Sequence, residues 1–121
     1  MHRYPESANA LIVNPKGEIL LQLRDNKKTL IAPNAWGIFG GHLIGDEKPK
    51  DALFRELKEE LEYEADNETY FYFVAEYNTH IFIVYCPFTD TKSFVLHEGR
   101  NKRFFTKEQI DFVAKMWNDF N

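Results

Sequence analysis

The chain has 121 residues, 44% of them hydrophobic and 16% aromatic, which is enough for one compact domain with a single buried core. The net charge of −4 argues against nucleic acid as the main partner, because phosphate binding usually requires a basic surface. No apolar run approaches the roughly 18 residues of a membrane-spanning helix, and the N-terminus lacks the apolar stretch of a secretion signal. We therefore expect a cytoplasmic protein without a membrane partner, forming one domain over residues 1–121.

The first part of the chain predicts a β-hairpin. Residues 8–13 and 18–24 are rich in apolar and β-branched side chains, and residues 14–17, Asn-Pro-Lys-Gly, are typical of a turn. Residues 25–35 are expected to form a loop. Residues 36–39 then predict a short apolar strand that ends at a double glycine.

The remainder of the chain predicts two helices and two further strands. Pro49 suits the first turn of a helix that runs to about residue 61. Residues 70–77 and 79–86 predict long strands, and Cys86 is interpreted as a buried, inert thiol. Residues 106–109 match a capping box, which predicts a last helix behind it. Strands and helices interleave around one sheet, which predicts an α/β sandwich.

The helix near residue 55 carries an unusual group of acids. Residues 46–68 contain ten acidic and four basic side chains, so the acidity of the chain is local. At about 100° per residue, Glu56, Glu59 and Glu60 fall in one sector beside the apolar side chains. Such a cluster suits a hard divalent cation, which takes oxygen ligands. The alternative is a solvated acidic face, which is a common explanation for runs of charge.

The segment around this helix closely resembles the Nudix box, G-x5-E-x7-R-E-U-x-E-E-x-G-U, where U is a bulky aliphatic residue. The match covers 23 positions, and its charged and glycine positions are Gly41, Glu47, Arg55, Glu56, Glu59 and Glu60. The order of the flanking elements is similar over nearly the full chain, and size and layout resemble the MutT-like members that hydrolyse nucleoside triphosphates. The chain departs from the box at Glu62 and Tyr63, and Phe39 replaces a proline. Because glycine at position 62 would supply a left-handed terminus, we expect the helix to run on or to close differently.

The resemblance implies a Nudix-type α/β/α sandwich with a mixed central sheet, and a site that binds Mg²⁺, with Mn²⁺ as a substitute. Glu56, Glu59 and Glu60 match the family's metal-binding glutamates, and the carbonyl of Gly40 matches a backbone ligand. Arg55 and Glu47 match a pair that supports the loop containing Gly41 and orients the catalytic carboxylates.

The resemblance leaves the general base and the substrate contacts open. Glu98 lies where MutT-like proteins carry the base, and Glu59 and then His97 are the next candidates. Three residues are candidates for substrate binding, and each has an ordinary alternative. Arg24 either contacts the phosphate or base of the nucleotide or is an exposed arginine at the end of a strand. Trp36 either stacks on a base or is a packing residue. His42 either contacts phosphate or is an exposed residue without a role.

The expected activity is Mg²⁺-dependent hydrolysis of a nucleoside diphosphate linked to a group X. A nucleoside triphosphate, including an oxidised one, is the first candidate substrate because the chain is short. Its products would be the nucleoside monophosphate and pyrophosphate. Hydrolysis of a nucleotide sugar such as ADP-ribose, or nucleotide sensing without turnover, are the alternatives. The expected oligomeric state is a monomer or a homodimer.

Overall fold

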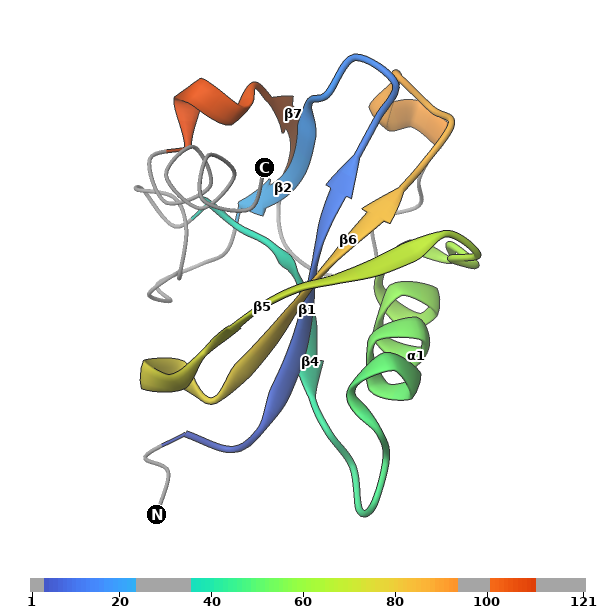
Figure 1. The fold of residues 1–121 in the computed structure, drawn as a ribbon. Helices are drawn as coiled ribbons and strands as arrows, with labels where there is room; N and C mark the ends of the chain where they lie inside the picture. The colour runs from blue at the N-terminus through green and yellow to red at the C-terminus, as the bar shows by residue number, and fades with distance from the viewer. Residues whose placement is uncertain (1–3, 24–35, 94–100, 111–121) are drawn as a thin grey trace.

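The computed structural model describes residues 4–23, 36–93 and 101–110, which form a sheet with one long helix at its side (Figure 1). The strands are β1 (Ser7–Val13), β2 (Ile19–Leu23), β3 (Trp36–Gly37), β4 (Phe39–His42), β5 (Glu68–Val74), β6 (Thr79–Tyr85) and β7 (Asn101–Phe105). The helix is α1 (Pro49–Leu61), and 3₁₀ turns lie at η1 (Ala75–Tyr77), η2 (Thr91–Ser93) and η3 (Lys107–Gln109).

Strand β1 is the centre of a mixed sheet, which has seven strands within the described residues. Its first half pairs antiparallel with β4 and its second half antiparallel with β2, while its full length runs parallel to β6. Strand β5 pairs antiparallel with β6, and both β3 and β7 pair with β2. This confirms the predicted fold class, a mixed α/β architecture.

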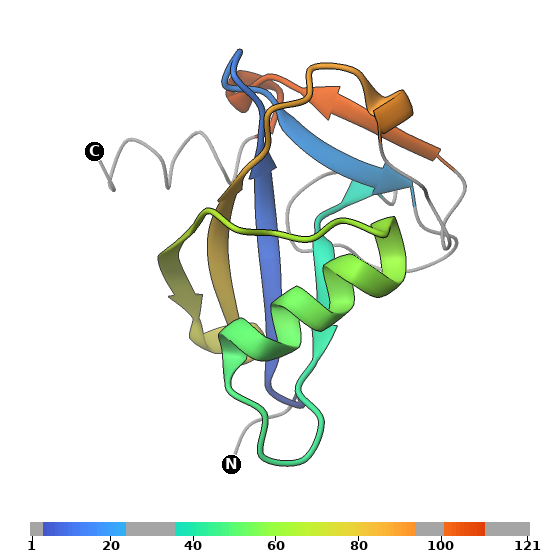
Figure 2. The same ribbon diagram turned by 90° about the vertical axis from the view of Figure 1, so that its right-hand side faces the viewer.

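Helix α1 lies across one face of the sheet and packs against β1 and β4 (Figure 2). It begins with Pro49 in the first turn, where the missing N–H costs nothing. Its buried side chains join the even-numbered residues of β1 in one core cluster. On the helix these side chains are Ala52, Leu53, Leu57 and Leu61. The odd-numbered residues Leu11 and Val13 face the opposite side, in a second core cluster.

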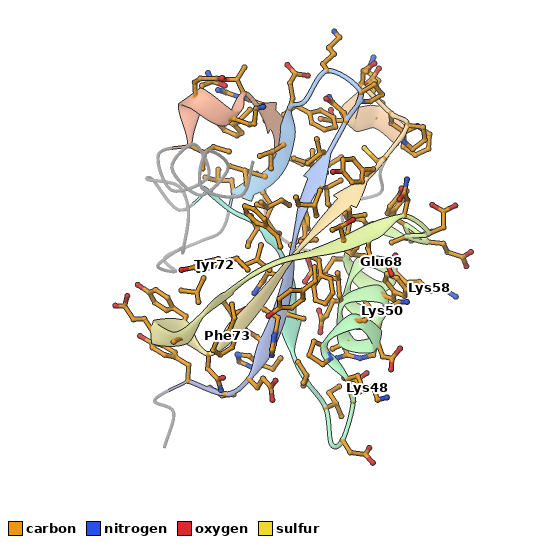
Figure 3. The ribbon with its side chains drawn as sticks, viewed as in Figure 1. Lys48, Lys50, Lys58, Glu68, Tyr72 and Phe73 are labelled. Carbon is orange, nitrogen blue, oxygen red and sulfur yellow. The ribbon has the colours of Figure 1, made fainter. Side chains whose placement is uncertain are left out.

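An ion pair ties the first turn of α1 to the edge of the sheet. The Lys50 Nζ lies 3.0 Å from Glu68 Oε1, and Figure 3 shows the two side chains together at the start of β5. Tyr72 and Phe73 lie toward the other end of the same strand (Figure 3). The helix is therefore held at β5 as well as by its apolar contacts with β1 and β4.

The end of α1 corrects one expectation. Glu62 adopts the left-handed conformation, with φ 51° and ψ 32°, although it is not glycine. Its N–H donates to the carbonyl of Lys58 at 2.9 Å, and the N–H of Tyr63 donates to that of Leu57 at 3.3 Å. The helix therefore does not run on or close differently, because hydrogen bonds to the last carbonyls hold a left-handed terminus.

Several predicted elements are confirmed and others are corrected. The hairpin, α1 and the 79–86 strand are found close to their predicted bounds. The double glycine does not end a strand but lies inside β4, where pairing with β1 overrides the low strand propensity of glycine. The strand predicted over 70–77 gives way to η1 at residue 75, and β7 was not predicted.

The last part of the chain is described only to residue 110. The capping box is present in η3, where the Thr106 N–H donates to Gln109 Oε1 at 2.7 Å. The rest of the predicted last helix, and with it the second helical layer of the sandwich, lies outside the described residues. Cys86 is buried as predicted, and burial raises the pKa of its thiol. In the part of the chain that is described, no helix has the length and apolar character needed to cross a membrane.

Candidate metal and catalytic site

Arg55 fastens α1 to the loop that follows β4. Its Nε donates to Glu47 Oε2 at 2.8 Å and its Nη2 donates to Glu47 Oε1 at 3.0 Å, a two-bond pairing of guanidinium and carboxylate. Nη2 also donates to the carbonyl of His42 at 3.1 Å, and Glu47 accepts the N–H of Ile44 at 2.8 Å. Arg55 and then Ile44 hold the pKa of Glu47 below its ordinary value, and Glu47 in turn raises the pKa of Arg55. The loop is thus closed on itself and on the helix.

The third nitrogen of Arg55 contacts the carboxylates of the helix. Nη1 donates to Glu56 Oε1 at 2.8 Å and to Glu59 Oε2 at 3.4 Å, so one guanidinium touches three carboxylates. The Glu56 side chain is 17% exposed and that of Glu59 is 59% exposed. Because water screens the more exposed pair, the contact with Glu56 is the stronger one.

Gly41 provides the space in which the Glu56 carboxylate lies. A Cβ at position 41 would come within 2.6 Å of both the carboxylate carbon and Oε1 of Glu56. Any side chain here would displace the carboxylate from the strand. The sequence therefore places glycine where the helix carries its glutamate against the backbone of β4.

Gly40 is constrained from the other side, by β1. Its φ is +146°, which other residues rarely adopt, and a Cβ there would overlap the carbonyl oxygen of Ala8 and lie 2.6 Å from the Cα of Asn9. The carbonyl of Gly40 belongs to the peptide unit that joins it to Gly41, the glycine against which the Glu56 carboxylate lies. The predicted backbone ligand and a predicted carboxylate ligand are therefore neighbours.

Glu60 and Glu59 are adjacent in the chain but lie in different surroundings. Glu60 is 5% exposed and is the one acidic side chain among the buried residues described, whereas Glu59 faces solvent. Burying a carboxylate is costly unless it is paired, hydrogen-bonded or bound to a cation. The acidic sector of α1 thus begins at the core and ends in water, as its position beside the apolar side chains predicts.

These residues fit a hard cation in chemistry but are not gathered around one point. Their donors are carboxylate oxygens next to a backbone carbonyl, which is the donor set that Mg²⁺ prefers. Over residues 4–23, 36–93 and 101–110, no three histidine, cysteine, aspartate or glutamate side chains form a group that could hold a metal ion. Instead Arg55 engages Glu56 and Glu59. Binding a cation would require Glu59 to turn from Arg55 toward Glu56 and the backbone of β4, and the Glu59 side chain is 59% exposed.

The other predicted site residues are placed only in part. His42 is exposed at the end of β4, and its carbonyl is bound by Arg55. Arg24, Glu98 and His97 lie outside the described residues, as does the side chain of Trp36. Their roles stay predictions. Asn9, which borders Gly40, was not singled out from the sequence, although polar residues on one face of an otherwise apolar strand were an available signal.

The comparisons with known proteins agree with one another. A family model described as NUDIX domain matches residues 3–119. A curated relative, the RNA pyrophosphohydrolase of Marinomonas sp. (strain MWYL1), is 36% identical over 58 residues, which are 48% of this chain and 32% of that protein. The match therefore spans only about a third of the relative's length.

Solved structures share the fold over nearly the whole chain. A MutT structure, from a study of Aliivibrio salmonicida and Vibrio cholerae, has a TM-score of 0.70 at 17% identity and covers 98% of this chain and 100% of its own. A C. elegans Ap4A hydrolase in a binary complex has a TM-score of 0.66 at 19% identity and covers 95% of each chain. At such identities the likeness establishes the fold alone.

Proposed function

Because this chain belongs to the NUDIX domain family and is a Nudix hydrolase, we propose that it cleaves a nucleoside diphosphate linked to a group X in a Mg²⁺-dependent reaction. We further propose that residues 1–121 form a single domain of this family, in support of which the family model covers nearly the full chain.

The observation that supports this proposal most is the set of contacts made by Arg55. It links the carboxylates of Glu47, Glu56 and Glu59, and Glu56 lies directly against the backbone of Gly41. A solvated acidic face does not need such an arrangement, because its carboxylates would point to water. Here a loop, a strand and a helix are joined at one point by charge-assisted hydrogen bonds.

Glu56, Glu59, Glu60 and the carbonyl of Gly40 are the groups that would hold the cation. When bound, Mg²⁺ supplies charge stabilisation at the phosphate oxygens and lowers the pKa of coordinated water. Arg55 and Glu47 hold the loop and the first carboxylate in place, which is the role of residues that support metal ligands. His42, Arg24 and Trp36 are proposed to contact the nucleotide.

The reaction is a displacement at phosphorus. A water oxygen forms a bond to the attacked phosphorus while the bond from that phosphorus to the bridging oxygen breaks. The leaving phosphate or pyrophosphate takes the bridging oxygen, and the proton of the water passes to a general base. Glu98 is the first candidate for this base, followed by Glu59 and His97.

A nucleoside triphosphate is the proposed substrate, cleaved to the monophosphate and pyrophosphate. The fold shared with MutT over nearly the whole chain supports it. Nucleotide sugars are the alternative within the same reaction class. Because matched relatives are named RNA pyrophosphohydrolase and Ap4A hydrolase, a triphosphate RNA end and a dinucleoside polyphosphate are also to be tested.

The decisive experiment is a panel of nucleotides incubated with the purified protein and separated by chromatography, with Mg²⁺ or with chelator. The panel contains ordinary and oxidised triphosphates, nucleotide sugars, a dinucleoside tetraphosphate and a short RNA with a 5′-triphosphate. Mg²⁺-dependent formation of a monophosphate and pyrophosphate from a triphosphate supports the proposal. Tight nucleotide binding without any product would instead identify a sensor.

A further inference from the structure

On the sheet face opposite α1, the side chains of β1 change from apolar to polar where β1 pairs with β4. Leu11 and Val13 lie in the core on this face, and Asn9 and Ser7 continue the same row. They meet Thr79, the first residue of the neighbouring strand β6. We call these three residues the polar cluster: Ser7, Asn9 and Thr79.

The polar cluster is a connected hydrogen-bond network. Ser7 Oγ donates to Thr79 Oγ1 at 2.7 Å, and Asn9 Nδ2 donates to the same oxygen at 2.6 Å. Ser7 is 9% exposed and Thr79 is 2% exposed. Buried hydroxyls are costly without partners, so these short bonds fix the side-chain orientations. Thr79 is also stiff because it is β-branched.

The polar cluster ends against Gly40. Asn9 is the direct partner of Gly40 in the β1–β4 pairing, and its Oδ1 lies 2.6 Å from where a Cβ of Gly40 would be. Gly41, by contrast, pairs with Ala8 and opens toward Glu56 on the helix side. The two glycines are therefore flanked by the Asn9 carboxamide, beside Gly40, and by the Glu56 carboxylate, beside Gly41 on the helix side.

Two adjacent glycines need such support because their backbone can take many other conformations. Gly40 reaches a φ of +146° without strain because it lacks a Cβ, so its surroundings must select this conformation among the others open to it. A flexible apolar side chain at position 9 would fill the space without fixing the peptide. A planar carboxamide anchored by a buried threonine restricts it.

We propose that Asn9 and Thr79 are positioning residues that set the orientation of the Gly40 carbonyl for the metal. This inference rests on the proposed function, in which that carbonyl is a ligand. The polar cluster itself does not touch the cation. It acts by limiting the rotation of the Gly40–Gly41 peptide, so its loss weakens metal binding and leaves nucleotide contacts in place.

The test is Thr79→Val, which nearly keeps the shape and removes the oxygen that accepts both bonds. Mn²⁺ binding is followed by electron paramagnetic resonance without nucleotide, and hydrolysis is followed against Mg²⁺ concentration. We expect Mn²⁺ affinity to fall by about tenfold, as for other residues that orient metal ligands. High Mg²⁺ should restore the rate, with KM for the nucleotide unchanged, and Thr79→Ser should restore affinity.

A matched control separates positioning from general loss of stability. Asn14→Ala removes the carboxamide that accepts the Lys16 and Glu18 N–H groups in the distal hairpin turn, far from the glycines. It should lower the melting temperature without changing Mn²⁺ affinity. If Thr79→Val fails to fold, Asn9→Ala is the second variant, since Asn9 is only partly buried and the Ser7–Thr79 bond survives.

The outcomes are distinguishable. If wild type binds Mn²⁺ and Thr79→Val or Asn9→Ala binds it equally well, the inference is overturned while the proposed function stands. A raised KM at saturating Mg²⁺ with unchanged Mn²⁺ affinity would also overturn it, because the polar cluster would then act on the substrate. If wild type itself binds no divalent cation, the proposed function fails and the inference with it.

Discussion

Gly41→Ala tests whether the place of the Glu56 carboxylate matters for activity rather than for folding. The added methyl would lie 2.6 Å from the Glu56 carboxylate carbon, so the carboxylate must move away from β4. Because this is the end of a flexible side chain, the move costs little. Loss of the 2.8 Å bond to Arg55 costs about 1 kcal/mol, and replacing a strand glycine recovers about 0.5–1 kcal/mol. Net stability should change by less than about 1 kcal/mol, whereas the rate should fall by about tenfold or more.

Gly40→Ala is the matched comparison at the neighbouring position. Its methyl would meet the backbone of Ala8 and Asn9 at a φ of +146°, and neither strand can give way easily. Backbone strain of about 1–3 kcal/mol and overpacking of about 1–3 kcal/mol predict a loss of about 2–6 kcal/mol. Urea unfolding gives both stabilities, and product chromatography gives the rates. A Gly41→Ala variant that is stable and fully active would refute the claim that Glu56 must lie against the strand.

Three further predictions concern the helix terminus, the loop and the metal. Glu62→Gly removes the strain of a left-handed non-glycine residue but gives the unfolded chain more conformational freedom. The free energy of unfolding in urea should therefore change by less than about 1 kcal/mol, and turnover should stay within a few fold of wild type. A large gain in activity would contradict this. Glu47 has a pKa held below 4.5 by Arg55, so its contribution to stability is complete above that pH and is lost as pH falls through the lowered value. In Glu47→Gln the melting temperature should therefore fall less steeply below about pH 4.5 than in wild type, and parallel curves would exclude this role. Mg²⁺ at a hundred times its dissociation constant should stabilise the fold by about 2.7 kcal/mol, and identical melting curves in Mg²⁺ and chelator would argue against a metal site.

The elements with strong local signals were predictable from the sequence. Pro49 predicts the first turn of α1, and the turn at residues 14–17 predicts the hairpin. The resemblance to the Nudix box likewise implies that Arg55 and Glu47 act as a pair, which requires a loop that folds back on the helix. Their contact is observed, and its role in the reaction stays a proposal.

Other features depend on tertiary pairing and were not predictable in this way. The glycines of β4 have low strand propensity, and only the edge offered by β1 makes them a strand. Residues 101–105, Asn-Lys-Arg-Phe-Phe, lack the alternation of a half-buried strand, yet they pair with β2 as β7. The left-handed conformation of Glu62 was not predicted. Hydrogen bonds to the last helical carbonyls outweigh the strain of its side chain, and these bonds form only in the folded helix. The position of Asn9 beside Gly40 depends on strand register, which the sequence does not specify alone.

The most direct measurement of the central claim is the hydrolysis rate of Glu59→Gln on a nucleotide that wild type clearly turns over. The control is Glu64→Gln, since Glu64 is an exposed glutamate at the same end of the helix that pairs with Lys58 at 3.5 Å. If Glu59 helps to hold the cation, the rate should fall by about a hundredfold or more, or about 2.7 kcal/mol of barrier, with weaker Mn²⁺ binding and an intact fold. Glu64→Gln should keep the wild-type rate. Near-normal hydrolysis by Glu59→Gln would contradict the assignment of this carboxylate to the catalytic centre.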